Sequence, residues 1–311
     1  MKIVFMGTPD FAVPTLKALF NTEHEIVGVY CQPDKPVGRK QILTAPPVKE
    51  FAVSNGLKVF QPVSLKNDEV YEELKNLSPD LIVVVAYGKI LPENILKLPR
   101  LGCINGHASL LPKYRGASPI QWAIVCGEKC TGVTTMFMDV GLDTGDILET
   151  VQTKIYDNET GEELFNRLSV LTANLMLSTV DKAQKGLLTP VKQNDQEATY
   201  APIIKKEMGL LDFSKTAFDL KNLIRGFNSW PVAYTFFNGK RLKVFTAEIG
   251  EATDKAPSTV IKTGDILQIA CGNNTSIIFK EVQLEGSKRM SVADMLKGNA
   301  IDVGTMLAVS K

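Results

Sequence analysis

Two polar side chains near the middle of the chain have the types and spacing of a catalytic pair. The sequence contains only two histidines, and His107 ends an apolar stretch, 103–107, that has the pattern of a strand. Ligands of doubly wound sheets bind beyond the carboxyl ends of strands, so His107 is placed to act as an acid or base. Asn105 lies on the same side of an extended chain and can donate a hydrogen bond to an oxygen that gains negative charge.

Three aspartates in one short segment are candidates to orient this histidine. A catalytic histidine usually needs a carboxylate that fixes its tautomer and stabilises its charged form. Residues 138–146 contain Asp139, Asp143 and Asp146 together with two glycines, which predicts a tight loop. Spacing alone does not choose among the three, because aspartates in turns also hydrogen-bond their own backbone.

No serine or cysteine of the chain lies in the sequence pattern of a nucleophile elbow. Asparagine, histidine and aspartate without a nucleophile suit direct attack of a substrate amine on a carbonyl carbon. In that chemistry the histidine and aspartate move protons, and the asparagine stabilises the tetrahedral oxyanion.

The sequence disfavours several other kinds of chemistry. The first strand-to-helix turn, 7–10, has one glycine where a dinucleotide-binding turn needs three, and no Walker loop is present. The five cysteines are scattered, and the one close pair, Cys126 and Cys130, has no second pair near it. We therefore expect no metal site and no disulfide framework.

The chain also lacks membrane and export signals. Its longest apolar run, 81–87, is far shorter than the roughly 18 residues that a membrane span requires, and its start has no signal-peptide pattern. These observations predict a cytoplasmic protein that does not interact with membranes.

The elements that must position these residues alternate between strands and helices. Short apolar runs have the pattern of buried strands, and 162–183 has the pattern of a long amphipathic helix. This alternation predicts an α/β domain with a doubly wound, Rossmann-like, mostly parallel sheet. The predicted strands lie at 2–6, 25–31, 57–60, 81–86, 103–107, 131–138 and 147–155. Residues 33–47, with four prolines, are expected to form a polar loop.

The pattern changes after this domain. Residues 186–206 are polar, and beyond Pro231 short strands follow one another, with an Asn-Gly turn at 238–239 that is typical of a hairpin. We predict a catalytic domain at 1–189, a linker at 190–207 and a small β-barrel domain, OB-like, at 208–311. From Lys205 on, 15 basic and 11 acidic residues give a charge of +4, which is weakly consistent with a polyanionic partner.

At this point the residues resemble a known family. The segment 105–122, which reads NGHASLLPKYRGASPIQW, strongly resembles the central motif of the methionyl-tRNA formyltransferase family. Asp143, 36 positions after His107 (143 − 107), falls where that family has its catalytic aspartate. Residues 3–14, 85–92 and 227–231 resemble further motifs of the family, so the likeness covers essentially the whole chain. Short Asn-x-His motifs occur in other folate formyltransferases and hydrolases, but the extension 115–119 and the β domain narrow the choice.

The resemblance implies substrates and site residues. The formyl donor would be 10-formyltetrahydrofolate and the acceptor initiator methionyl-tRNA. The enzyme would need no metal and is expected to be a monomer. The implied catalytic residues are Asn105, His107 and Asp143. The implied folate-binding residues are Tyr87, Gly88, Ile90, Leu91, Pro92, Ser109, Leu110, Leu111 and Pro112. The implied tRNA contacts are Lys35, Arg39 and Lys40 in the loop 33–47, since basic side chains suit phosphates.

Gly106 departs from the expected pattern. We expect a larger apolar residue between Asn105 and His107, and glycine within a strand is expected to loosen it.

Three other functions fit part of the pattern. An enzyme acting on the amino sugar of a nucleotide would use the same catalytic set but would have less need of a basic second domain. A hydrolase would deliver the formyl group to water and release formate without an acceptor. An RNA-binding protein with an inactive catalytic domain would have no need of intact Asn105, His107 and Asp143.

Overall fold

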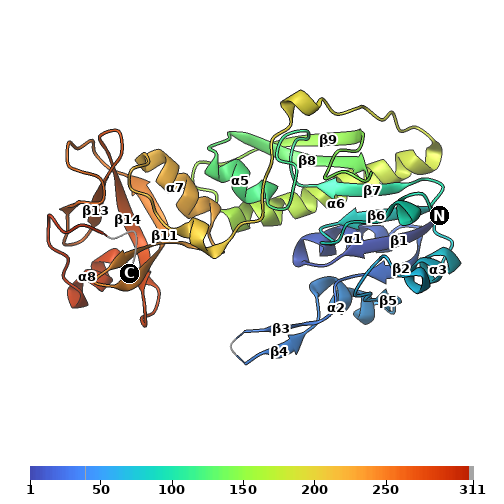
Figure 1. Ribbon diagram of the computed structural model, residues 1–311, viewed down its shortest axis with the longest axis horizontal. Coiled ribbons are helices and arrows are strands. Elements are labelled where there is room, and N and C mark those ends of the chain that lie inside the picture. Colours follow the sequence, from blue (N-terminus) through green and yellow to red (C-terminus); the bar gives the residue numbers. More distant parts are fainter. Residues whose placement is uncertain (39, 308–311) are drawn as a thin grey trace. The chain divides into compact units, whose positions relative to one another are not determined.

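The structure of the protein is a computed structural model that describes residues 1–38 and 40–307. The chain divides into two compact units (Figure 1). Unit 1 consists of Met1–Pro119, Thr131–Thr153 and Phe165–Ala201. Unit 2 consists of Ile120–Cys130, Lys154–Leu164 and the described residues from Pro202 on.

Unit 1 is built on one seven-stranded sheet with the order β5-β2-β1-β6-β7-β8-β9. The first five strands in this order are parallel, and β8 is antiparallel to β7. The mostly parallel, doubly wound sheet predicted from the sequence is thus confirmed. Its strands are β1 (Lys2–Gly7), β2 (Glu25–Tyr30), β5 (Val59–Phe60), β6 (Leu81–Val85), β7 (Cys103–His107), β8 (Cys130–Phe137) and β9 (Ile147–Lys154).

Buried side chains cover both faces of this sheet, which explains why its central strands have continuous apolar sequences. Every residue of β6 is buried. One face carries Val4, Ile82 and Cys103, which are neighbours on three adjacent strands and belong to one core cluster. The opposite face of β7 contacts a long helix through Gly106. Because side chains alternate along a strand, Asn105 and His107 share the face that carries Cys103.

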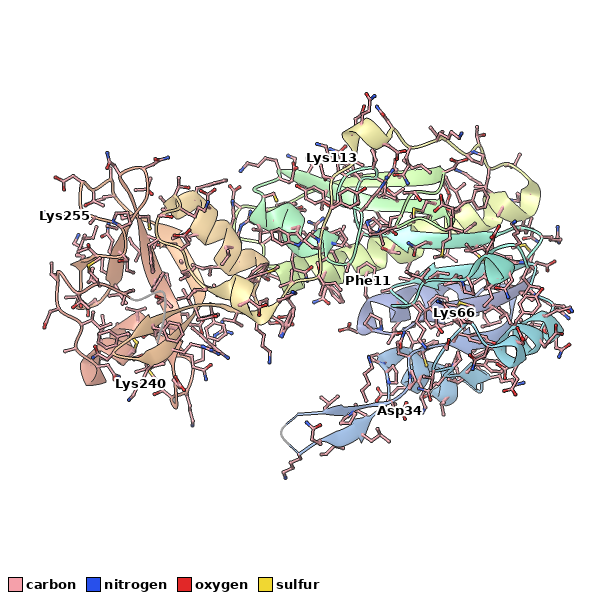
Figure 2. The ribbon with its side chains drawn as sticks, in the orientation of Figure 1. Phe11, Asp34, Lys66, Lys113, Lys240 and Lys255 are labelled. Atoms are coloured by element: carbon pink, nitrogen blue, oxygen red, sulfur yellow. The ribbon has the colours of Figure 1, made fainter. Side chains whose placement is uncertain are left out.

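Helices connect or follow the strands of unit 1. They are α1 (Val13–Phe20), preceded by the 3-10 turn η1 (Asp10–Ala12), then α2 (Pro47–Ser54), α3 (Asp68–Asn76), α4 (Glu93–Leu96) and α6 (Gly161–Lys185). Figure 2 shows Phe11 of η1 within the unit, and its ring packs edge to face on Phe165 of α6 at a centroid distance of 5.0 Å. This contact of apolar side chains ties the start of the first helix to the long helix.

The segment 33–47 contains a hairpin and is not an irregular loop, so the prediction from the sequence was wrong on this point. β3 (Lys35–Val37) pairs antiparallel with β4 (Ile42–Thr44) as a separate two-stranded sheet. The hairpin projects from unit 1 below α2 in Figure 1. All six strand residues are exposed, so their pairing is backbone to backbone and leaves little amphipathic pattern to detect.

Unit 2 contains a six-stranded antiparallel sheet with its own apolar core. The pairing path runs β10-β11-β14-β13-β12, with β15 beside β14, which agrees with the predicted change to short strands. The strands are β10 (Ala233–Phe237), β11 (Lys240–Ile249), β12 (Val260–Lys262), β13 (Leu267–Cys271), β14 (Thr275–Leu284) and β15 (Met290–Ser291). The helical elements are α5 (Pro119–Val125), η3 (Lys206–Gly209), α7 (Ala217–Gly226) and α8 (Val292–Gly298).

Residues 190–201 follow α6 and remain part of unit 1. They contain only the short 3-10 turn η2 (Asp195–Glu197), yet they bond to unit 1 at several points. Val191 exchanges two backbone hydrogen bonds with Ile147. The backbone N–H of Ala201 donates to the carbonyl of Arg115, and its carbonyl accepts from the N–H of Ser118. Residues 190–201, two thirds of the segment assigned to a linker, are therefore attached to unit 1. The domain limits 1–189, 190–207 and 208–311 stay a prediction.

Gly106 is explained by the close approach of α6. A Cβ at this position would lie 2.7 Å from Thr172 Cγ2 and 3.3 Å from Met176 Cε. The strand is also paired on both sides, to β6 and β8. The glycine therefore makes room for a helix against a fully paired strand.

Replacing Gly106 by alanine should lower the free energy of unfolding by about 1–3 kcal/mol, because the added methyl overpacks the contact with α6. Thr172→Ser removes the clashing methyl and retains the hydroxyl, so the double variant should recover most of the loss. Urea denaturation measures both changes. Gly298→Ala is the matched control, since a Cβ there meets nothing within 4 Å. Equal stability of Gly106→Ala and Gly298→Ala would contradict this packing.

Candidate active site

His107 and Asn105 lie where the parallel strands end. His107 is the last residue of β7, and β1 and β6 end at the same edge of the sheet at Gly7 and Val85. Loops that follow these strands therefore gather at this edge. Asn105 is partly exposed, and its side chain makes no hydrogen bond with the described residues. Its amide is thus available to a bound molecule.

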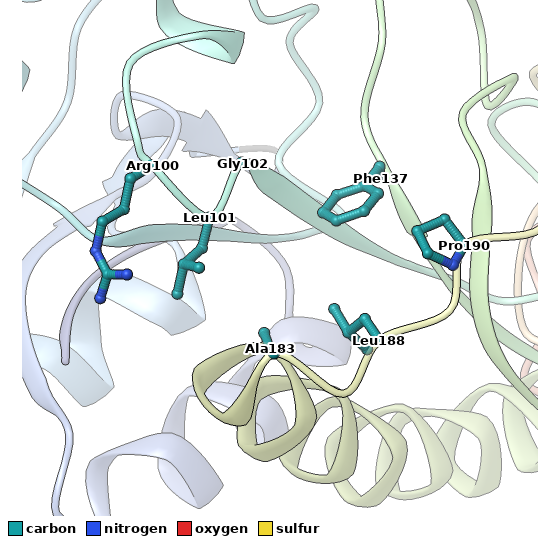
Figure 3. Close-up of a pocket in the computed structure, with 8 residues that line it drawn as sticks. Arg100, Leu101, Gly102, Phe137, Ala183, Leu188 and Pro190 are labelled. Atoms are coloured by element: carbon teal, nitrogen blue, oxygen red, sulfur yellow. The ribbon is translucent and has the colours of Figure 1, made fainter.

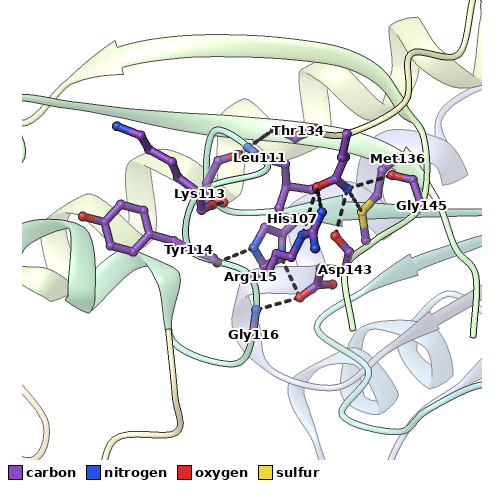
Figure 4. A network of polar contacts seen from close by, with 12 residues as sticks. His107, Leu111, Lys113, Tyr114, Arg115, Gly116, Thr134, Met136, Asp143 and Gly145 are labelled. Carbon is purple, nitrogen blue, oxygen red and sulfur yellow. Dashed lines mark hydrogen bonds and ion pairs between the residues drawn. The ribbon is translucent and has the colours of Figure 1, made fainter. Parts of the chain in front are cut away.

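The ring of His107 is held between a carbonyl and a carboxylate (Figure 4). Its Nε2 lies 2.9 Å from the carbonyl oxygen of Tyr114, and its Nδ1 lies 3.7 Å from Oδ2 of Asp143. A carbonyl only accepts hydrogen bonds, so Nε2 must carry the proton of the neutral ring. The lone pair is then on Nδ1, which is the atom that can take up or give a proton beside Asp143.

Asp143 is the aspartate that the fold brings to His107. Its Oδ2 accepts a hydrogen bond of 2.8 Å from the backbone N–H of Gly116, and its side chain is only 14% exposed. No partner of Oδ1 is found among the described residues. Asp139 instead accepts bonds from Gly141 N–H and the Thr144 hydroxyl within its own loop. The structure therefore separates a turn-forming aspartate from the one that faces the histidine.

Close approaches of backbone at two glycines make this arrangement possible. A Cβ at Gly145 would lie 1.8 Å from the carbonyl oxygen of Phe137, so the loop can fold back on β8 only without a side chain. Gly116 has a φ of +116°, and a Cβ there would lie 2.8 Å from the carbonyl oxygen of Ala201. The N–H that holds Asp143 thus comes from a position that favours glycine.

The segment 109–112, predicted to bind folate, is fixed by hydrogen bonds to its own chain and to β8. The Ser109 hydroxyl is fully buried and donates to the carbonyl of Lys113 at 2.6 Å. The Thr134 hydroxyl of β8 donates to the Ser109 carbonyl at 2.7 Å and accepts from Leu111 N–H at 3.2 Å. The Leu111–Pro112 peptide is cis. These bonds define the backbone path immediately after His107.

The loop 87–92 offers mainly its backbone and Ile90. The side chains of Tyr87 and Leu91 are 1% and 2% exposed and belong to the core, whereas Ile90 is 82% exposed. The carbonyl of Tyr87 accepts hydrogen bonds from the side chains of Thr8 and Gln32, which ties the loop to the ends of β1 and β2. An apolar ligand at this loop would therefore meet Ile90 first.

Lys89 of the same loop is held by two carbonyls of a neighbouring segment. Its Nζ donates to Pro62 O at 2.5 Å and to Val63 O at 2.6 Å. Partial burial is the main cause that lowers the pKa of Lys89 below its usual value, and the charge of Lys35 is the second cause. Lys89 thus fastens the loop at the edge of the sheet.

A groove of about 240 Å³ lies at the base of the hairpin, lined by the loops after β1 and β2 and by Lys35. The hairpin root is braced by Lys49, which pairs with Asp34 at 2.8 Å (Figure 2 labels Asp34). Lys35 and Lys40 are exposed. Arg39, the third predicted tRNA contact, lies outside the described residues. The hairpin therefore presents cations on a braced support, as phosphate binding requires.

A larger, mainly apolar pocket of about 370 Å³ lies elsewhere (Figure 3). Its lining includes Gly102, which precedes β7, and Phe137, which ends β8. Both positions are at the end of β7 opposite His107. This pocket holds none of the predicted site residues.

Sequence reasoning missed residues that shape the site. Arg115 is 2% exposed and bonds to Gln193, whose amide reaches the loop of Asp143. Thr134 and Gly116 hold the two loops beside His107. No short sequence motif marks these residues as partners, because each contact joins segments that are far apart in the chain. The one signal in the sequence was the arginine at position 115, shortly after the histidine motif. Its burial is seen only in the structure.

Among residues 1–38 and 40–307, no three histidine, cysteine or acidic side chains gather as metal ligands do. No helix in that part of the chain has the length and apolarity needed to cross a membrane.

Comparisons with known proteins identify the family to which this fold belongs. The formyl transferase family model matches residues 1–180, and the model of the formyl transferase C-terminal domain matches 203–300. Together the fold and these two matches, which cover most of the chain, define a formyl transferase.

Individual relatives narrow this class. The chain is 52% identical to the methionyl-tRNA formyltransferase of Caldanaerobacter subterraneus subsp. tengcongensis, over 99% of this chain and 100% of the relative. It is 48% identical to that of Lachnospira eligens, over 99% of each. The chain therefore belongs to the methionyl-tRNA formyltransferase family.

Solved structures support the fold alone. An N-formyltransferase from Helicobacter canadensis, in complex with folinic acid and dTDP-3-aminofucose, superposes with a TM-score of 0.68 at 21% identity. The match covers 90% of this chain and 98% of that one. That enzyme is named an N-formyltransferase and holds an amino-sugar nucleotide, so likeness of fold does not distinguish the acceptors. The high sequence identities to the methionyl-tRNA formyltransferases do.

Thr134→Val should lower the free energy of unfolding by at least about 1–3 kcal/mol, because the buried Ser109 carbonyl and Leu111 N–H each lose their partner. Thr134→Ser keeps the hydroxyl and should retain most of the stability. Thermal unfolding of the two variants side by side measures the difference. If Val and Ser variants unfolded at the same temperature, the hydroxyl would not hold the 109–112 segment.

Proposed function

We propose that the protein transfers the formyl group of 10-formyltetrahydrofolate to the amino group of methionyl initiator tRNA. The observation that carries this proposal is the approach of Asp143 to Nδ1 of His107, which lies two strand positions beyond Asn105 and on the same face. The family membership supports formyl transfer from a folate-derived donor. The near-full-length relatives named for methionyl-tRNA support the acceptor.

In the proposed reaction the methionyl amine attacks the formyl carbon. A C–N bond forms, and the formyl oxygen gains the electron pair of its π bond. The amine nitrogen then loses a proton, the electron pair on the oxygen re-forms the C=O bond as the bond from the formyl carbon to folate N10 breaks, and N10 receives a proton. The products are formyl-methionyl-tRNA and tetrahydrofolate, with no net change in protons.

Three side chains act on these steps. Asn105 donates a hydrogen bond to the oxygen that becomes negative. Protonated His107 offers only its Nδ1–H to this oxygen, since Nε2–H is engaged by Tyr114 O. Asp143 stabilises the charged ring, and its Oδ1, which has no partner among the described residues, is placed to accept the amine proton.

The segments around the pair suggest how each substrate is held. We assign the folate to the fixed segment Ser109–Pro112 and to the 87–92 loop with its exposed Ile90. Of the predicted folate residues, Tyr87 and Leu91 would contribute through their backbone, since their side chains are buried. Folinic acid in the Helicobacter enzyme of like fold is consistent with a folate at this edge. A monomeric state and a cytoplasmic location stay predictions.

The direct test is formyl transfer from 10-formyltetrahydrofolate to charged initiator methionyl-tRNA, beside elongator methionyl-tRNA and a reaction without acceptor. Selective formylation of the initiator is the expected result. Formate release without an acceptor would instead indicate a hydrolase. A turnover only with amino-sugar nucleotides would assign the other acceptor.

His107→Ala and Asp143→Asn should each lower kcat at least about 10²-fold, because each removes a group needed in the transition state. His24→Ala and Asp146→Asn are matched controls, since neither side chain forms a hydrogen bond or ion pair with His107 or Asp143 in the described part of the chain. Steady-state formylation kinetics measure all four. Near-normal turnover of either His107→Ala or Asp143→Asn would refute the assignment.

Lys35→Ala and Lys40→Ala should raise KM for tRNA while kcat at saturation stays within about twofold. Each loss of a phosphate contact should also reduce the slope of log KM against log salt by roughly 1. Lys185→Ala, on the exposed end of α6 beside the distant pocket, is the control. An unchanged salt slope in both hairpin variants would show that these lysines do not contact phosphates.

A further inference from the structure

The amide of Gln193 joins two segments that meet beside His107. Its Nε2 donates to the carbonyl of Asp143 at 2.8 Å and to the carbonyl of Gly145 at 2.7 Å. Its Oε1 accepts from Arg115 Nε at 3.1 Å and Nη2 at 2.8 Å. All of these residues belong to unit 1, and Figure 4 labels these three partners of Gln193, which are Arg115, Asp143 and Gly145.

The chemistry of the partners fixes which way the amide points. The two carbonyls only accept hydrogen bonds, so they require the NH₂ group, and the guanidinium only donates, so it requires the oxygen. A glutamate could satisfy Arg115 but would oppose the two carbonyls, and a leucine could satisfy neither. Glutamine is therefore matched in both hydrogen-bonding character and length.

Arg115 provides a rigid support for Gln193. Its side chain is 2% exposed, and its Nη2 also pairs with Asp195 at 2.7 Å. Asp195 is 81% exposed, so this ion pair adds little by itself. The buried guanidinium instead orients Gln193 from the segment that also supplies Gly116, the donor to the Asp143 carboxylate.

The backbone at Asp143 needs such a restraint. Its φ is +53°, in the left-handed region that non-glycine residues adopt at a cost. The neighbouring residues Val140 and Leu142 are exposed, so core packing does not hold the loop there. Two hydrogen bonds on the carbonyls of residues 143 and 145 act on the backbone that carries the carboxylate.

We infer that Gln193, held by Arg115, is a positioning residue that keeps the Asp143 carboxylate against Nδ1 of His107. This inference rests on the proposed roles of Asp143 and His107. Gln193 itself contacts neither ring nor carboxylate. Its removal should therefore displace the carboxylate and slow the chemical step without weakening substrate binding to the same extent.

The test compares Gln193→Leu with Gln196→Leu, an exposed glutamine of the same segment whose side chain holds nothing. Gln193→Leu should lower kcat about 10- to 100-fold, with KM for folate and tRNA changed less than about threefold. Gln196→Leu should match the wild type. Full kcat in Gln193→Leu would overturn the positioning role. So would a fall in kcat/KM that came entirely from a higher KM.

A double-variant cycle separates positioning from general damage. In the Asp143→Asn background, Gln193→Leu should reduce kcat by less than about threefold further, because its effect passes through the carboxylate. A loss as large as in the wild-type background would show that Gln193 acts elsewhere. Gln193→Glu serves if the leucine variant fails to fold, since it keeps the Arg115 contact, removes the donation to the two carbonyls and sets a carboxylate oxygen against them. It should lose kcat at least to a similar extent, and full kcat would contradict the inference.

A readout without turnover distinguishes failure of this inference from failure of the proposed function. The chain has two histidines, so the NMR spectrum contains two ring Cε1–H signals, one from each ring, with His24 as an internal reference. Gln193→Leu and Asp143→Asn should both move the His107 signal, whereas Gln196→Leu should leave both signals in place. An unmoved His107 signal in Gln193→Leu would overturn the positioning role even if formylation were confirmed, and a moved signal would support it even if the substrate were another amine.

Discussion

The arrangement of the site depends on one carboxylate oxygen with two neighbours. Oδ2 of Asp143 accepts the backbone N–H of Gly116 and lies 3.7 Å from Nδ1 of His107. The separation from the ring exceeds a hydrogen bond but suits an ion pair once the ring is protonated. The contact is therefore strongest when the ring is protonated, which is the state in which the ring can donate to the formyl oxygen as that oxygen becomes negative.

Much of unit 1 can be understood as the means of bringing this oxygen to that ring. The parallel strands deliver His107 and Asn105 to one edge, and the return of the loop after β8 is possible because Gly145 lacks a side chain. The backbone after His107 turns so that Tyr114 O fixes the ring nitrogen that carries the proton. Thr134 holds the same turn from β8. Helix α6 packs behind the strand at Gly106.

The sequence was sufficient to predict the sheet and the place of its histidine. Those predictions depend on local apolar runs and on side-chain alternation, which are set by residues close together in the chain. The choice of Asp143 over Asp139 was not available from spacing. It depends on Asp139 using its oxygen for Gly141 and Thr144, a detail of turn geometry that composition does not encode. The family resemblance supplied that choice.

Other features could not be predicted because they arise from contacts distant in sequence. Gly106 was expected to loosen its strand, but α6, more than sixty positions later, occupies the space a side chain would need. The hairpin at 35–44 was hidden by prolines and by strands whose side chains are all exposed. Gln193 lies in a segment of little regular structure, so nothing local marks it as a partner of the Asp143 loop.

The most direct test of this account is the tautomer of His107 in the neutral ring, measured from the two ring ¹⁵N chemical shifts. Because Tyr114 O only accepts, the account predicts a proton on Nε2 and a bare Nδ1 facing Asp143. A proton on Nδ1 of the neutral ring would mean that Nδ1 is not the atom that takes up a proton beside the carboxylate, and the proposed pairing of the two side chains would be wrong.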